Sequence, residues 1–210
     1  MLHAVTGFAL VAAVLTIIPG LDTTLVLRTA IARGRDQAAV TAAGVCAGLL
    51  VWGVAAAVGA AALLAASELA YRMISYAGIA YMVYLGSAMI VRSFRSHEEQ
   101  TQDAAHAPRR ESLWQAFVTG AGTNILNPKI GVFYIATMPQ FIPAGNSPLG
   151  MGLLLAGVHV LLTLAWFTLI ITGAYAAKRW LSRPRATRII DRVAGVVIIG
   201  FAGRLALQPR

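Results

Sequence analysis

The residues NILNPK at positions 124–129 interrupt an apolar region that extends from Ser112 to Pro143. Such a stretch is costly in hydrocarbon, because one charge at the centre of a membrane helix costs about 2.5–3.5 kcal/mol and a proline removes a backbone donor. One interpretation is a kinked helix whose lysine reaches the membrane surface. The other is a polar site inside the membrane, and a second break of the same kind, PGLD at positions 19–22, favours it.

The composition is that of a polytopic membrane protein. Of the 210 residues, 58% are hydrophobic and 12% are charged, whereas soluble domains carry about 25% charged residues. The net charge of +9 comes from basic clusters between apolar segments, which we interpret as anchors at the membrane surface and not as a nucleic-acid site. Residues 2–18 lack the basic n-region with which a secretory signal peptide begins. We therefore predict that they form a first span that is retained.

Six apolar segments are predicted to span the membrane. The last is the weakest, and five spans with one surface helix are the alternative. Glu68 and Arg72 predict a short turn between the second and third spans, and residues 93–111 predict a cytosolic linker. The spans cover approximately residues 2–27, 37–67, 73–91, 113–143, 149–177 and 189–207.

The distribution of basic residues predicts the orientation. Thirteen of the 17 lysines and arginines lie in segments that face one side, and three lie on the other. The side with more positive charge is the cytoplasmic one. Both termini are therefore predicted on the non-cytoplasmic side.

The expected fold is an all-α membrane protein with two inverted three-helix repeats. Residues 1–210 form a single transmembrane domain, with one half at about 1–92 and the other at about 112–210. Each half begins with a span broken by a proline, and a glycine-rich span follows. Because three spans is an odd number, equivalent halves insert with opposite topology, which is a recurring plan of secondary transporters.

Five separated stretches have the order of motifs found in one transporter family. They are Pro19-Gly20-x-Asp22, Leu25-Val26-Leu27-Arg28, Ala32-Arg33-Gly34-Arg35, Asn124-x-x-Asn127-Pro128-Lys129 and Pro139-Gln140-Phe141. The chain thereby resembles the LysE/RhtB superfamily of amino-acid exporters over nearly its full length. It departs at Leu21, where the family usually has proline. The resemblance implies a bacterial inner-membrane translocator that exports amino acids or related small metabolites by exchange with protons.

The predicted binding site lies at the two breaks. Lys129, with Asn124 and Asn127, is expected to bind the carboxylate of an amino acid, while Asp22 binds the ammonium or carries the coupling proton. His159 has two interpretations, a hydrogen-bonded packing residue or a proton relay, because histidine titrates near neutrality. The helix breaks expected to line the site are Pro19, Gly20 and Pro128.

Other classes of function remain as alternatives. A divalent metal-ion exporter needs Cys, His or carboxylate ligands, of which the spans offer mainly Asp22, Cys46 and His159. A non-transporting membrane subunit accounts for the glycines but not for the charged breaks. A single cysteine cannot support a thiol relay. No nucleotide-binding or catalytic motif is present, so we predict no enzyme, cofactor or metal. The glycine-rich faces suit a homodimer or intrachain packing equally.

Overall fold

The structure is a computed structural model that describes residues 1–94, 112–143, 145–174, 176 and 184–207. Every regular element within these ranges is helical, as expected from the sequence. The helices are α1 (Leu2–Ile17), α2 (Leu21–Arg33), α3 (Arg35–Ala66), α4 (Glu68–Arg92), α5 (Leu113–Ile125), α6 (Pro128–Thr137), the 3-10 helix η1 (Met138–Phe141), α7 (Pro148–Thr172) and α9 (Pro184–Ala206).

Two helices of the described part are long and apolar enough to cross a membrane. They are Arg35–Gly59 within α3 and Pro148–Thr172, each of 25 residues. The pair α1 and α2 passes the same test when taken together, with a bend of 52° between its members. A helix of 25 residues is about 37 Å long, which exceeds the hydrocarbon core of about 30 Å. The chain is therefore an all-α membrane protein.

Two stretches that the sequence placed between predicted spans, 28–36 and 68–72, are largely helical. α2 continues to Arg33, and only Gly34 separates it from α3. Gly34 has φ 93°, a left-handed conformation that favours glycine. The predicted turn at Glu68 and Arg72 is wrong, because α4 begins at Glu68 and contains Arg72. The charged residues mark where a helix leaves the apolar region. The helix itself does not end there.

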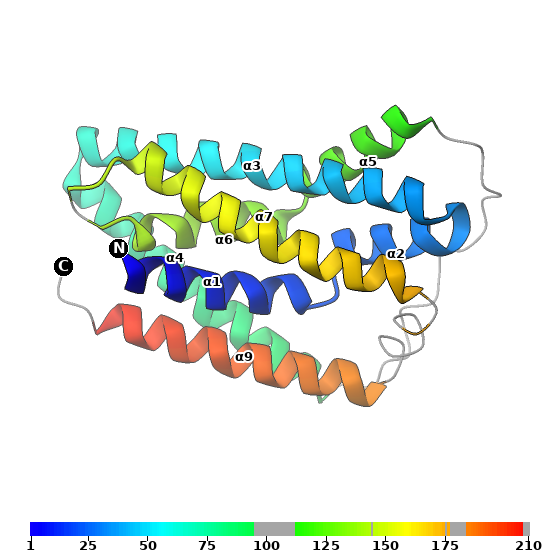
Figure 1. Ribbon diagram of the computed structural model, residues 1–210. Coiled ribbons are helices and arrows are strands. Elements are labelled where there is room, and N and C mark those ends of the chain that lie inside the picture. Colours follow the sequence, from blue (N-terminus) through cyan, green and yellow to red (C-terminus); the bar gives the residue numbers. More distant parts are fainter. Residues whose placement is uncertain (95–111, 144, 175, 177–183, 208–210) are drawn as a thin grey trace.

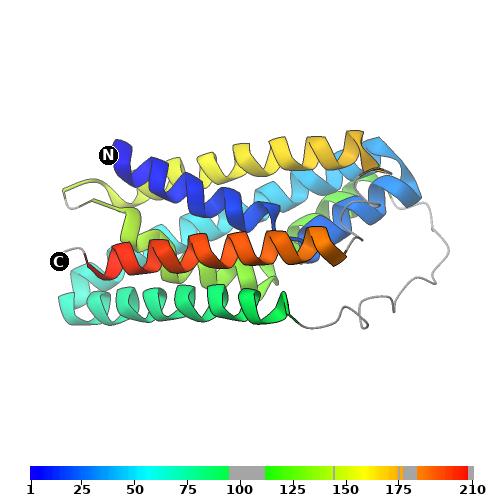
Figure 2. The ribbon, with the colours of Figure 1, turned by 90° about the horizontal axis from the view of Figure 1, so that it is seen from below.

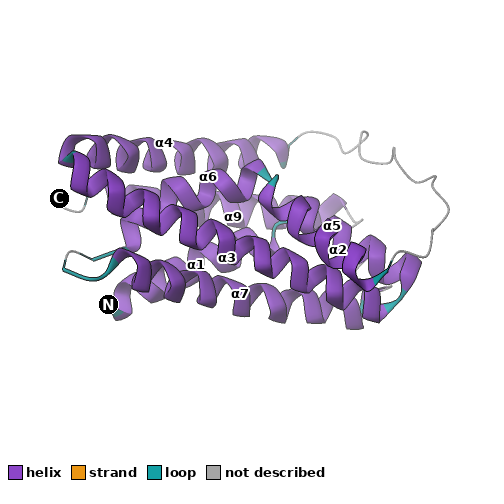
Figure 3. Cartoon of the chain, turned by 90° about the horizontal axis from the view of Figure 1, so that it is seen from above, coloured by secondary structure: helices purple, strands orange, loops and turns teal. Residues whose placement is uncertain are grey.

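The helices run roughly along one axis, with both termini at the same end of the bundle (Figures 1 and 2). The opposite end holds the junction of α2 with α3 and the start of α5 (Figures 1 and 3). Most of the predicted linker, at 95–111, and the basic residues at 178–183 lie outside the described residues. The bundle thus has one end that carries the termini and one that carries the basic helix junctions.

Glycines bring the backbones of neighbouring helices into contact. A methyl group on Gly44 of α3 would overlap the Phe117 carbonyl of α5, and one on Gly120 of α5 would overlap the Thr41 carbonyl of α3. Between α4 and α9, a methyl group on Gly195 would lie 2.6 Å from the Gly86 carbonyl oxygen. Small residues of this kind allow membrane helices to approach closely. They place α3 directly against the broken helix pair of the second half.

The buried apolar side chains form two clusters. The larger joins α1, α3, α6, η1, α7 and α9 and includes Phe8, Phe133 and Phe141. The smaller joins α2, α3 and α7, and its buried members are Val26, Ala42, Val45, Phe167 and Ile170. The polar residues at the two helix breaks lie between these clusters.

Candidate functional site

The first break separates α1 from α2. α1 ends at Ile17, Ile18 is extended, and Gly20 precedes the first residue of α2. Because Pro19 has no N–H group and disfavours a helical conformation for the residue before it, the helix cannot continue through this point. The break leaves carbonyl groups at the end of α1 and N–H groups at the start of α2 without their usual helical partners.

The second break separates α5 from α6. α5 ends at Ile125, and Asn127 caps α6 by accepting a hydrogen bond at Oδ1 from the Lys129 N–H (3.1 Å). Pro128 takes the first position of α6, where its missing N–H group is not needed. Trp52 of α3 donates from Nε1 to the Asn124 carbonyl at 3.4 Å. The break is therefore a capped and supported structure.

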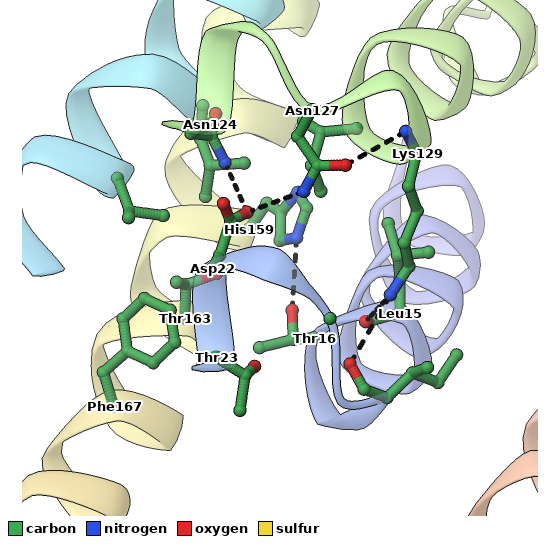
Figure 4. A pocket seen from close by; sticks show the side chains of 15 residues that line it. Leu15, Thr16, Asp22, Thr23, Asn124, Asn127, Lys129, His159, Thr163 and Phe167 are labelled. Carbon is green, nitrogen blue, oxygen red and sulfur yellow. Dashed lines mark hydrogen bonds between the residues drawn. The ribbon is translucent and has the colours of Figure 1, made fainter. Parts of the chain in front are cut away.

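Asp22 joins the two breaks. It lies in the first turn of α2, where the helix dipole favours a negative charge. Its Oδ2 accepts hydrogen bonds from Asn124 Nδ2 at 2.8 Å and from Asn127 Nδ2 at 3.3 Å (Figure 4). Residues more than 100 positions apart in the sequence thus meet at one carboxylate oxygen.

Two acceptor oxygens at this place have no hydrogen-bond partner among the described protein atoms. They are Asp22 Oδ1 and Asn124 Oδ1, and both are buried. The Asn124 side chain is fully buried, and it packs so closely on Gly48 of α3 that a methyl group there would lie 2.6 Å from its Oδ1. Buried acceptors without donors are unfavourable. Asp22 Oδ1 lies on a residue that lines the cavity, so it suits a ligand that brings N–H or O–H donors.

Lys129 places its charge at the other end of the site. Its Nζ donates to the carbonyl oxygens of Leu15 at 3.2 Å and Ile18 at 3.5 Å (Figure 4). These carbonyls belong to the C-terminal end of α1, where the helix dipole favours a cation. A charge that lies unfavourably in the first turn of α6 is therefore stabilised by the end of α1.

His159 of α7 connects three helices. Thr16 donates its hydroxyl to the Ala12 carbonyl at 2.7 Å, so its oxygen is free to accept a hydrogen bond from His159 Nε2 at 3.1 Å. Tyr134 of α6 then donates to His159 Nδ1 at 3.0 Å. This assignment makes the imidazole neutral, with its proton on Nε2. His159 links α7 to α1 and α6 beside the charged residues.

These side chains surround a cavity of about 30 Å³, which is enough for about two water molecules. Its polar lining is Thr16, Asp22, Thr23, Asn124, Asn127, Lys129, His159 and Thr163. Its apolar lining is Leu15, Ile18, Val45, Leu49, Ile130 and Phe167, with Gly20 beside them. An amino acid such as leucine needs a wider space than this cavity offers.

The structure brings together the side chains predicted for the site. Asp22, Asn124, Asn127, Lys129 and His159 all line the cavity, as does Gly20, while Pro19 and Pro128 shape the breaks without lining it. Their role in binding stays a prediction.

Sequence analysis missed Thr163 and Phe167. They follow His159 at intervals of four residues and form one stripe of α7. That spacing was the available signal.

No group of three or more His, Cys, Asp or Glu side chains is arranged to hold a metal ion in the described part of the chain. The alternative of a divalent metal-ion exporter therefore finds no ligand set among these residues. The candidate site is one carboxylate, one ammonium and two amides between broken helices.

Comparisons with known proteins agree over almost the whole chain. The sequence model described as "LysE type translocator" matches residues 13–209. The chain is 30% identical over 211 residues to "Uncharacterized membrane protein YrhP" of Bacillus subtilis, covering 99% of this chain and 100% of the relative. It is 28% identical over 192 residues to "Leucine efflux protein" of Klebsiella pneumoniae, covering 90% and 88%.

A further relative is "Putative amino-acid transporter YggA" of Aeromonas salmonicida, with 29% identity over 192 residues, 90% of this chain and 89% of the relative. No solved structure matches the chain.

Proposed function

The chain belongs to the family of LysE type translocators, and from this premise we propose that it exports amino acids or related small metabolites across the bacterial inner membrane. The observation that carries the proposal is the cavity at the two helix breaks, beside which lie an unpartnered carboxylate oxygen of Asp22 and the ammonium of Lys129. Two relatives whose names refer to leucine efflux and amino-acid transport support the same class of cargo.

The cavity suits a zwitterion with an aliphatic side chain. The cargo ammonium donates to Asp22 Oδ1, which has no other partner among the described atoms. The cargo carboxylate accepts a hydrogen bond from Lys129 Nζ. To make this bond, Nζ moves away from the α1 carbonyls to which it donates in the structure. About half of the remaining lining is aliphatic or aromatic and none of it is a carboxylate, so it favours an uncharged side chain over a cationic one.

Transport follows an alternating-access cycle between two inverted halves. α1 and α2 lead away from the end that carries the termini, whereas α5 and α6 lead back toward it (Figure 1). This opposite direction is what inverted repeats require. The cavity lies between the halves, because Asp22 belongs to the first and Asn124, Asn127 and Lys129 to the second. Rocking of one half against the other opens the cavity to each side in turn.

A proton gradient supplies the energy in this proposal. Asp22 takes up the coupling proton when cargo is absent, because its Oδ1 is a buried acceptor beside the cavity. His159 lies in the same lining and is the second residue proposed to relay protons. One carboxylate thus binds either the cargo ammonium or a proton, and this competition links export to proton entry.

The orientation follows from charge. Arg33 and Arg35 lie at the junction of α2 with α3, at the end opposite the termini (Figure 1). The positive-inside rule assigns this basic end to the cytoplasm and both termini to the other side.

Inside-out vesicles containing the overexpressed protein test the proposal. They are given a mixed amino-acid pool with and without a pH gradient, and accumulated solutes are identified by mass spectrometry. We expect gradient-dependent uptake of one or a few aliphatic amino acids. Asp22→Asn vesicles, matched for the amount of inserted protein, lose this uptake because the carboxylate charge is gone. Uptake equal to that of empty membranes for every amino acid would refute the proposal.

A further inference from the structure

The cavity is not centred along α7. Its lining residues on this helix are His159, Thr163 and Phe167. His159 lies eleven residues after the start of α7 at Pro148, whereas Phe167 lies five residues before its end at Thr172. At 1.5 Å per residue these separations are about 16 Å and about 7.5 Å. Within α7, the stretch beyond Phe167 is therefore the shorter one.

This shorter stretch of α7 leads to the basic end of the bundle. Arg35, the first residue of α3, donates from Nη2 to the carbonyl of Thr172, the last residue of α7, at 3.4 Å. Between that contact and the cavity lies the smaller apolar cluster, with five buried members in the described residues against eighteen in the larger. The smaller cluster therefore lies on the proposed cytoplasmic side of the cavity, and we call it the gate.

Phe167 and Val45 belong both to this smaller cluster and to the lining of the cavity. Phe167 is 3% exposed and Val45 is 1% exposed. Val26, in the same cluster, lies one helical turn after Asp22 in α2 and is fully buried. Phe167 and Val45 therefore form the wall of the cavity on the side of the gate. We call this wall the floor.

The polar anchors define the direction of the cargo side chain. Figure 4 shows Lys129 and Phe167 on opposite sides of Asp22. A cargo held by its ammonium at Asp22 and by its carboxylate toward Lys129 has its side chain directed toward Phe167. The size of the floor residue then limits the length of the side chain that fits when the gate closes.

We infer that Phe167 determines cargo specificity, because its ring closes the cytoplasmic entrance and forms the floor of the pocket for the cargo side chain. This inference rests on the proposed function and adds a size limit to it. Aliphatic side chains of the size of valine or leucine fit above the ring once the halves separate. Aromatic side chains collide with it and prevent closure.

The test measures uptake of alanine, leucine, phenylalanine and tryptophan by inside-out vesicles, for the wild type and for Phe167→Ala. We expect the ratio of kcat/KM for phenylalanine to that for leucine to rise by about ten-fold or more. The matched control is Phe141→Ala, because Phe141 is also 3% exposed but belongs to the larger cluster and does not line the cavity. This control keeps the wild-type ratio.

A second variant reduces the space for the cargo side chain instead of enlarging it. It also provides a test if Phe167→Ala does not fold. Val45→Phe adds bulk to the floor, so it should abolish leucine uptake while alanine uptake continues. An unchanged ratio in Phe167→Ala, or an equal change in Phe141→Ala, would overturn the inference. If Phe167→Ala does not accumulate, Val45→Phe with unaltered leucine uptake overturns it instead. Wild-type vesicles that move no amino acid refute the proposed function itself, which is a separate outcome.

Discussion

Gly48→Ala should impair transport through Asn124. A methyl group at Gly48 would lie 2.6 Å from Asn124 Oδ1 and 2.8 Å from its Cβ. Ordinary van der Waals contacts of a Cβ atom with its neighbours begin near 3.4 Å. The Asn124 side chain must therefore move by about 0.6–0.8 Å. Its Nδ2 is 2.8 Å from Asp22 Oδ2, and a shift of that size brings the hydrogen bond to its limit of length.

The size of the effect follows from this lost contact. This hydrogen bond joins two protein residues, and a hydrogen bond to a charged group contributes about 1.5–3 kcal/mol to stability. Its loss also leaves Asp22 with one of the two amides that hold its carboxylate. Overpacking costs about 1–3 kcal/mol of stability, and the better helix propensity of alanine offsets about 0.5–1 kcal/mol of that. We therefore expect Gly48→Ala to lower both stability and transport.

Two measurements on the same preparations check this expectation, the initial rate of uptake in vesicles and the unfolding midpoint of the purified protein. Gly59→Ala is the control, because Gly59 is also in α3 and has no neighbour within 4 Å of the added methyl group. It should retain wild-type uptake and gain about 0.5–1 kcal/mol of stability from helix propensity. Wild-type uptake and stability in Gly48→Ala would show that Asn124 does not need the position seen here.

Three further substitutions separate the roles of the other residues. Lys129→Met keeps the length of the side chain and removes its ammonium, so uptake should fall about ten-fold to hundred-fold, and unchanged uptake at equal protein levels would contradict the carboxylate-binding role. Tyr134→Phe removes the hydroxyl that donates to His159 Nδ1 and should lower stability by about 1 kcal/mol in unfolding experiments while export continues. His159→Gln should export cargo without responding to an imposed pH gradient, and a wild-type response would assign the residue to packing alone.

The two helix breaks could be predicted because proline and charge in an apolar segment each have a local physical cost. The meeting of Asp22 with Asn124 and Asn127 was only a hypothesis from sequence, since contact over more than 100 residues depends on how the helices pack. The position of the Lys129 ammonium on the carbonyls of α1 was not predicted. No local pattern indicates which backbone oxygens a long side chain will reach. A hydrogen-bonded role was one of the two interpretations of His159, but its partners Tyr134 and Thr16 could not be predicted for the same reason.

Segment ends were less predictable than segments. Arg33 and Glu68 were assigned to loops because charge usually marks the membrane surface, yet both lie in helices that extend beyond the apolar region. The stripe formed by His159, Thr163 and Phe167 was visible in the sequence as a spacing of four. Its meaning required the structure, because an apolar helix has several faces and only packing selects the one that lines a cavity.

The length of α3 makes this protein responsive to the lipid around it. α3 is one unbroken helix of 32 residues, about 48 Å long against a hydrocarbon core of about 30 Å. It must tilt or project beyond the core, and the degree of tilt depends on the thickness of the bilayer. Its Gly48, Trp52 and Val45 touch the second break or line the cavity. Acyl-chain length therefore acts on the geometry of the cavity through the inclination of a single helix.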